Sequence, residues 1–253
     1  MKSLLAGLSL LFSVGWMTPL FGQTWTIVND QNIPYTGHRD IIPQQYRTYD
    51  VNPEQIKQVL WSAPHEYAQD VSTSNTKIIV GLADGSADIF RIVQYDMMEA
   101  GLAAQFTQIK TFVGVSISNP YRRLRADWTL DGFRAVISDL EGTMYIDPYQ
   151  RNDLTHRIAY FRKDLTSDRA WECGVITDQF NPNDIDHARV FGDCQFRTYR
   201  LAQATTGEYS NFFGATNSSQ SGIVLSQVVT AINRVNQVYE ADFSVRLILI
   251  NNT

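Results

Sequence analysis

A long central stretch of the chain alternates between hydrophobic and polar positions, as strands with one buried face do. The alternation is clearest between residues 123 and 130, where Leu124, Ala126 and Trp128 are separated by polar neighbours. Asp-Gly and Glu-Gly dipeptides lie between the apolar runs, and glycine adopts the positive φ of tight hairpin turns at little cost. The pattern predicts a mostly antiparallel β domain over about residues 50–163.

Two short helices are expected within this β pattern. Asn52 can cap a helix that begins at Pro53, because proline suits the first helical position and the next apolar residues recur at helical spacing. A second short helix is expected over residues 97–106. The expected strands cover residues 77–81, 87–93, 111–117, 123–130, 133–137, 143–146 and 156–161.

The hydrophobic period changes again after residue 195. A strand at 196–205 and a Gly-containing turn region at 206–217 precede apolar residues spaced by three and four over 219–240, which predict a long helix. A last strand is expected at 243–250. Strand, helix and strand predict a crossover with two parallel strands. Such a unit alone leaves strand edges unpaired, so it is expected to be the incomplete start of a parallel sheet, within an α+β fold overall.

The N-terminus has the layout of a secretory signal peptide. Lys2 supplies a positive charge, an apolar run covers residues 4–16, and Gly22 offers a small residue before a polar stretch. A membrane anchor is the alternative, but the run is shorter than the roughly 20 residues that span a bilayer. We therefore expect residues 1–22 to be removed. The mature protein is expected to be secreted, in an extracellular or periplasmic location, and not bound to a membrane.

Composition and charge narrow the function classes. With 44% hydrophobic residues the chain can build a core, and its formal net charge of −5 disfavours a nucleic-acid partner. The densest basic cluster is interpreted as the solvent face of a strand, and it consists of Arg122, Arg123 and Arg125. Acidic residues near the expected hairpin ends are interpreted as solvated turn residues, and these are Asp127, Asp131, Asp139 and Glu141. Asp147 is also expected to lie in a turn.

A polar, proline-containing stretch at residues 166–195 is interpreted as a linker that proteases could reach. It contains the two cysteines of the chain, Cys173 and Cys194. A pair of cysteines in an exported protein can form a single disulfide. The β domain must therefore be stabilised mainly by packing.

Several segments of the C-terminal part resemble the start of the catalytic domain in secreted bacterial reprolysin-like metallopeptidases, which are metzincins. They are RTYRLA at 197–202, ATTGEY at 204–209 and AINRVN at 231–236. Upstream segments at 84–86, 109–111 and 145–149 resemble the propeptide of the same group. The resemblance implies a propeptide over residues 23–165, a linker over 166–195 and the N-terminal part of a catalytic domain over 196–253.

The resemblance also implies a zinc endopeptidase that is made as an inactive precursor. Three histidines of the motif H-E-x-x-H-x-x-G-x-x-H would hold the zinc ion, and its glutamate would act as general base. This motif is absent from the chain, whose histidines are His38, His65, His156 and His187. His65-Glu66 begins like the motif, but Gln69 stands where the second ligand should be. We therefore expect no catalytic residue, no bound metal and no peptidase activity in this chain alone.

The segment around Cys173 resembles the cysteine switch of reprolysin propeptides, with Ile176 inserted into the usual Cys-Gly-Val-Thr. A thiolate at this position could occupy the zinc coordination site that the catalytic water needs. A disulfide between Cys173 and Cys194 and an inert pair of thiols are the alternatives. A disulfide would close a loop worth roughly 3 kcal/mol in the chain-entropy model.

Two functions follow as hypotheses. The first is the front part of a zinc metalloendopeptidase precursor, in which the propeptide docks on its own catalytic domain and the complete enzyme hydrolyses protein or peptide substrates. The second is a catalytically inactive exported binding or inhibitor module that folds as it stands.

Overall fold

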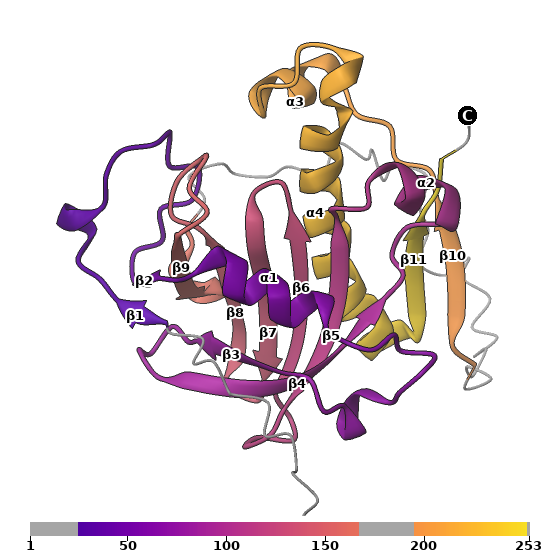
Figure 1. Ribbon diagram of the computed structural model, residues 1–253, viewed down its shortest axis with the longest axis horizontal. Coiled ribbons are helices and arrows are strands. Elements are labelled where there is room, and N and C mark those ends of the chain that lie inside the picture. The colour runs from indigo at the N-terminus through magenta and orange to yellow at the C-terminus, as the bar shows by residue number, and fades with distance from the viewer. Residues whose placement is uncertain (1–24, 167–194, 252–253) are drawn as a thin grey trace, which may run out of the picture.

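The computed structural model describes residues 25–166 and 195–251. A large antiparallel sheet dominates it, in the strand order β1-β2-β9-β8-β7-β6-β5-β4-β3 (Figure 1). The predicted α+β class with mostly antiparallel strands is thus confirmed. The strands of this sheet are Thr26–Ile27, Arg47–Asp50, Lys77–Gly81, Ala87–Tyr95, Lys110–Ser116, Arg123–Thr129, Gly132–Asp139, Gly142–Pro148 and His156–Phe161.

Tight hairpins join β3 to β4, β6 to β7 and β7 to β8, at turns that the sequence predicts. Gly85, Gly132 and Gly142 follow acidic residues at these three turns and have φ values of +92°, +79° and +130°. These positive values explain why glycine occupies each turn, since other residues rarely adopt them. The turns fix the register, and the register decides which side chains face the core.

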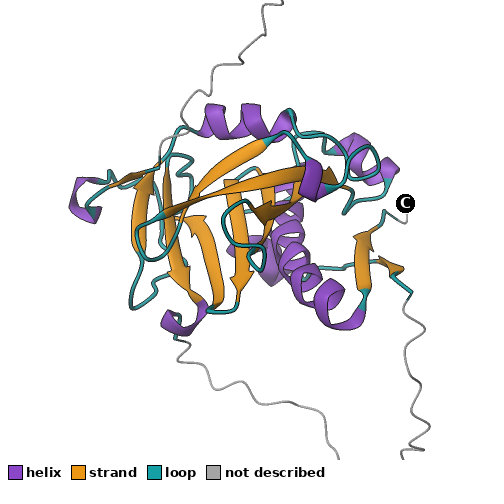
Figure 2. Ribbon diagram, turned by 90° about the horizontal axis from the view of Figure 1, so that it is seen from below, coloured by secondary structure: helices purple, strands orange, loops and turns teal. Residues whose placement is uncertain are grey.

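Helix α1 (Pro53–Trp61) lies inside the curl of the sheet (Figures 1 and 2). The side chain of Asn52 accepts a hydrogen bond from the backbone N–H of Gln55, as expected for its cap. Ile56 and Leu60 are buried among apolar side chains of the inner sheet face. Every fully buried member of this core lies between residues 49 and 159. The sheet and α1 therefore share a core that owes nothing to the chain after residue 195.

The C-terminal part forms the predicted strand-helix-strand unit. Strands β10 (Arg197–Leu201) and β11 (Val245–Leu249) pair in parallel. Helix α4 (Ser221–Phe243) joins them and packs on the outer face of the large sheet, opposite α1 (Figure 2). Within the residues that the structure describes, no helix is long and apolar enough to cross a bilayer.

Three smaller features differ from expectation. Helix α3 (Gly207–Phe212) replaces the expected turn region, because the side chain of Thr206 caps it and Arg151 donates to its last carbonyl at 2.7 Å. Helix α2 (Ala100–Gln105) is shorter than predicted. Single turns of 3-10 helix cover Asp30–Asn32, Val71–Thr73, Arg162–Asp164 and Ser218–Gln220.

The segment Met97–Glu99, just before α2, pairs with Leu249 at the end of β11. It binds the edge of β11 that faces away from β10. The backbone N–H of Leu249 donates to Met97 at 2.8 Å, and that of Glu99 donates back to Leu249 at 2.9 Å. Nearby, Tyr95, Met97 and Leu102 pack with residues of α4 and β11 in a second apolar cluster. The second cluster therefore includes side chains from both sides of residues 167–194.

Arg157 holds two hairpin ends together from inside the protein. Its guanidinium is fully buried and donates to the carbonyl oxygens of Asp131 and Asp153, both at 2.9 Å. Burial lowers the pKa of Arg157 to about 10. At the same turn, a Cβ atom on Gly132 would lie 2.2 Å from the Arg157 guanidinium, which leaves no room for a side chain.

We expect Gly132→Ala to destabilise the fold more than Gly214→Ala does. Both glycines have similar positive φ values, +79° and +85°, but a Cβ atom on Gly214 would meet no atom within 4 Å. The pair thus separates the clash from the backbone strain, and we expect the clash to add about 1–3 kcal/mol. Urea unfolding of both variants measures the difference. Equal losses would show that Arg157 moves aside freely.

Candidate functional site

On the outer face of the large sheet, polar side chains are concentrated where α4 packs against β6 and β7. Strand β6 directs Arg125, Asp127 and Thr129 to this face, and each is at most 6% exposed. The prediction that the arginine cluster faces solvent is wrong for Arg125, which forms an ion pair with Glu240 of α4. Arg125 lies at a polar position of the predicted alternation, but α4 rather than water covers its side chain.

Asp127 lies at the centre of this contact. The hydroxyl of Thr230 donates to one carboxylate oxygen at 2.8 Å, and the amide of Asn233 donates to the other at 3.2 Å. The carbonyl of the Asn233 side chain in turn accepts from the hydroxyl of Tyr95. The interpretation of Asp127 as a solvated turn residue is therefore wrong, because Asp127 lies within β6, inside the predicted strand, and α4 rather than water covers it.

Asp147 forms a second buried carboxylate on the same face. It lies in β8 rather than in a turn, with a fully buried side chain. Arg234 of α4 donates to it at 2.6 Å, and the hydroxyl of Tyr160 donates to its other oxygen at 2.8 Å. Arg134 lies 3.8 Å away, and the guanidinium of Arg234 sits over the ring of Tyr145 at 4.7 Å.

The two carboxylates differ in their electrostatics. Burial raises the pKa of Asp127, and the bonds from Thr230 and Asn233 do not compensate for it. Burial would also raise the pKa of Asp147, but the charges of Arg234 and Arg134 outweigh burial and hold the pKa below its usual value. Asp147 is therefore a charged ion-pair partner of α4, whereas Asp127 binds α4 through the neutral donors of Thr230 and Asn233.

Polar contacts continue to both ends of α4. Gln227 and Arg134 both bind Asp131 near the start of the helix. Near its end, Arg246 of β11 bridges Glu240 and Glu66, with 2.6 Å to each carboxylate.

Asp139, also interpreted as a solvated residue, has a buried side chain that accepts from Arg122 at 2.8 Å. Glu141 is exposed at its turn, as expected.

The sequence contains a signal for this interface that the apolar period hides. Polar residues recur at spacings of four, three and four along α4, which places them on one side of the helix. They are Ser226, Thr230, Asn233 and Gln237, and all four donate or accept hydrogen bonds with β6, β7 or the turn between them. A polar stripe beside the apolar stripe thus marks the contact with a polar sheet face.

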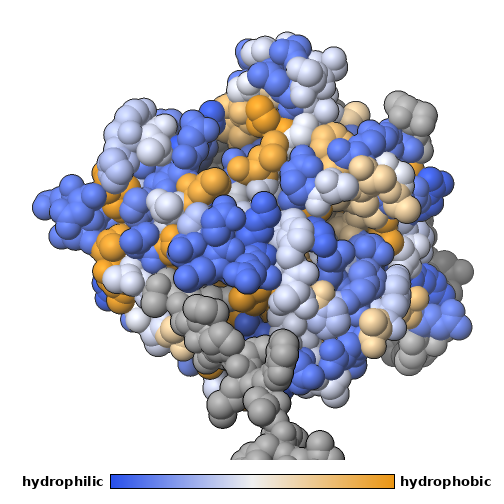
Figure 3. Space-filling view, in the orientation of Figure 1, coloured by the Kyte–Doolittle hydropathy of each residue, from blue (hydrophilic) through white to orange (hydrophobic). Residues whose placement is uncertain are grey.

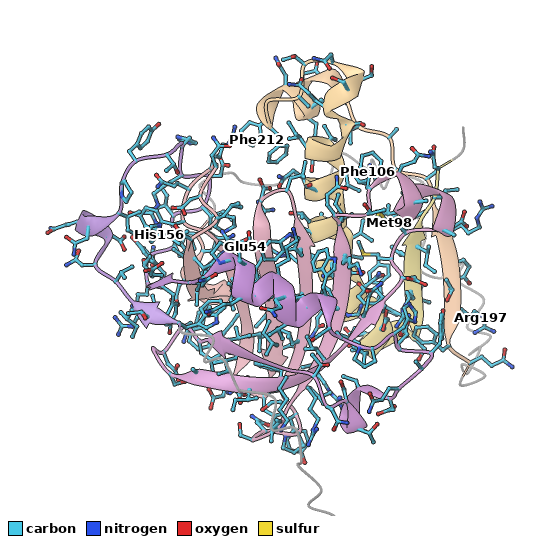
Figure 4. All side chains as sticks on the ribbon, in the orientation of Figure 1. Glu54, Met98, Phe106, His156, Arg197 and Phe212 are labelled. Carbon is cyan, nitrogen blue, oxygen red and sulfur yellow. The ribbon has the colours of Figure 1, made fainter. Side chains whose placement is uncertain are left out.

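The residues singled out for zinc chemistry do not converge on this interface. Cys173, Cys194 and His187 lie outside the described residues. His156 binds Asp153 at 2.9 Å on the side of the molecule away from Arg197 (Figure 4), and His65 lies 3.1 Å from Asp96. Over residues 25–166 and 195–251, no group of three or more His, Cys, Asp or Glu side chains could hold a metal ion.

Comparison with protein-family models, with curated proteins and with solved structures finds no match for the chain. The candidate site is therefore defined by its geometry alone. It is the buried polar contact between the outer sheet face and α4, centred on Asp127 and Asp147.

We expect Asp147→Asn to lower the free energy of unfolding by about 3 kcal/mol, because it removes the buried charge that pairs with Arg234, whose side chain is only 26% exposed. Glu99→Gln is the matched control, since it breaks a pair with Arg200 in which the side chains are 36% and 64% exposed. That exposed pair should be worth less than about 1 kcal/mol. Chemical unfolding of both variants tests the ranking, and similar losses would contradict it.

Asp127→Asn tests the raised pKa of the central carboxyl. Because the native protein holds this proton more tightly than the unfolded chain does, the stabilisation from protonation is complete below the unfolded pKa of about 3.9. It is lost as the pH rises through the higher native pKa. The stability of the wild type relative to Asp127→Asn should therefore rise as the pH falls from neutral towards about 4. Asp147 is present in both proteins, so its opposite effect cancels. A flat difference would refute the assignment.

Proposed function

We propose that this chain is the front part of the precursor of an exported zinc metalloendopeptidase. Residues 23–165 would act as a propeptide that assists folding and maintains latency, and residues 196–253 would begin the catalytic domain that it binds. The observation that carries the proposal is the buried polar contact between the outer sheet face and α4. The segments RTYRLA and AINRVN, which resemble reprolysin-like catalytic domains, form β10 and the middle of α4.

A propeptide must be able to exist without the domain that it releases. The larger core is complete within residues 49–159, so the sheet and α1 do not need α4 for their hydrophobic burial. The face that α4 would leave behind carries Arg125, Asp127 and Arg134, which water can solvate, beside a smaller apolar patch that includes Tyr95 and Ile109. An antiparallel sheet with one apolar and one polar face is stable with its polar face in water. The sheet is thus patterned to survive separation.

The contact itself has the composition of an interface between two proteins. Apolar residues such as Val229 and Leu249 pack against Met97 and Leu102 in one cluster. Around them lie charged pairs, among them Arg234 with Asp147 and Arg246 with Glu66. Interfaces between domains of one chain are more polar than domain cores, and they separate more easily. The charges give specificity, and they cost little when the parts are exposed to water again.

Zinc would be bound by the complete enzyme and not by the residues present here. Its role would be to activate water for attack on a peptide carbonyl, with a glutamate as general base. Cys173 is proposed as a thiolate ligand that blocks the water position in the precursor. A disulfide with Cys194 is the alternative, and both cysteines lie within 166–195, where cleavage would separate the two parts.

An inactive exported binding or inhibitor module remains the second candidate, and one observation favours it. The second apolar cluster combines Tyr95 and Ile109 with Val228 and Leu249, so the strand-helix-strand unit shares buried contacts with the sheet. In such a module, the charged pairs of α4 would be permanent. Protein ligands would then bind elsewhere on the surface.

Sequencing the reading frame beyond the codon for Thr253 separates the two candidates. We expect it to continue into H-E-x-x-H-x-x-G-x-x-H within about the length of one domain. An immediate stop codon would refute the peptidase proposal and leave the binding module.

If the frame continues, Cys173→Ser in the complete precursor tests latency, with Cys194→Ser as the matched control. Premature peptidase activity in Cys173→Ser alone supports the zinc-blocking role. Equal loss of stability in both variants, with latency unchanged, supports the disulfide.

A further inference from the structure

A groove of about 780 Å³ lies at the carboxyl ends of the parallel strands, beside the start of α4. Its walls come from α2, α3, the first turns of α4 and the residues that follow β11. Phe106 lies between α2 and α4 in Figure 4, and apolar side chains gather over α2 in Figure 3. The volume falls within the range typical of ligand sites, and parallel sheets commonly bind ligands at this end of their strands.

The lining of the groove has an apolar base and an uncharged polar rim. Leu102, Val228 and Leu249 are at most 8% exposed and form part of the base, with Phe106 beside them. The rim carries side-chain amides and hydroxyls, among them those of Gln105, Gln203, Ser210, Asn211 and Thr216. None of the described residues that line the groove is charged. An ion would lose its hydration here without gaining a counter-charge, so an uncharged ligand fits best.

We propose that this groove binds an extended, uncharged peptide segment and takes one apolar side chain into its base. Side-chain amides can donate to a peptide carbonyl and accept from a peptide N–H at the same time. Gln105 of α2 and Asn211 of α3 contribute such groups to the lining. The polar rim thus matches the alternating donors and acceptors of a main chain.

The contact beside the groove supports a peptide as the occupant. At Leu249, which lines the groove, the extended segment Met97–Glu99 already binds β11 through two main-chain hydrogen bonds. These two bonds use both main-chain groups of Leu249, so a peptide in the groove would extend this interface through the side-chain amides of the rim. Peptides commonly bind in this way, with main-chain bonds for affinity and a pocket for an alternate side chain.

Residues from both parts of the chain line the groove, so a bound ligand would also affect how firmly the two parts associate. Leu102, Gln105 and Phe106 belong to residues 23–165, whereas all other lining residues follow residue 195. A ligand that contacts both parts stabilises their association by mass action. The inference holds for a peptidase precursor and for an inactive module alike, because it needs neither zinc nor catalysis.

Titration of the purified chain with blocked peptides tests the proposal. The probes are acetyl-AALAA-amide, the same peptide with serine in place of leucine, and acetyl-ADLDA-amide, with binding followed by NMR. We expect saturable binding of the leucine peptide and at least tenfold weaker binding of the other two. No saturable binding of the leucine peptide, or equal binding of all three, would overturn the proposal. If a neutral oligosaccharide such as maltotriose binds saturably and the leucine peptide does not, the proposal that the ligand is a peptide is wrong.

Gln105→Trp and Gln108→Trp locate the bound peptide. Both glutamines are exposed and lie on or just after α2, but only Gln105 lines the groove. The larger side chain at 105 should narrow the groove and weaken binding of the leucine peptide at least tenfold, whereas the change at 108 should leave it unaltered. Retained binding in Gln105→Trp, with both variants folded by circular dichroism, would place the peptide elsewhere and overturn the proposal.

Discussion

The arrangement of this protein depends on how charge is buried between the sheet and α4. Asp147 would be costly in a dry environment, but Arg234 and Tyr160 bind both of its oxygens. Asp127 has only neutral donors and keeps a raised pKa. The donors Thr230, Asn233 and Arg234 on α4 reach these two carboxylates on the sheet in one register of the helix. Shifting it by one residue would move Thr230, Asn233 and Arg234 away from their acceptors.

The two faces of the sheet therefore have different physical roles. The inner face encloses α1 in an apolar core, and this core provides most of the hydrophobic burial. The outer face provides specific recognition of a helix. The sheet thus has an apolar core of its own on one face and binds a second unit on the other. An apolar inner face and a helix-binding outer face are the properties expected of a propeptide. They also account for two apolar clusters of unequal size, one inside the sheet and one beside α4.

Much of the fold could be predicted from local patterns. The alternation in β6, the Asp-Gly turns and the Asn52-Pro53 cap are determined by neighbouring residues, so α1 and the strands from β3 to β9 were expected near their observed positions. Strands β1 and β2 lie in or next to a polar stretch without alternation and were not predicted. The partners of Asp127 and Asp147 could not be predicted in this way, because a polar residue on the outer face of a strand looks the same whether water or a helix covers it. Helix α3 was missed for a similar reason, since Arg151, which holds its end, lies 61 positions away.

The separation of the two cores has a consequence for the order of events during synthesis. Chains emerge from the N-terminus and domains fold as units, so the sheet and α1 can be complete before α4 is translated. Until then the outer face is exposed to water, which can solvate its charged side chains. When α4 emerges, the first surface that it meets is already shaped to receive it. The earlier part of the chain would thus act as a template for the later part, and residues 23–165 would guide the folding of the unit to which they are joined.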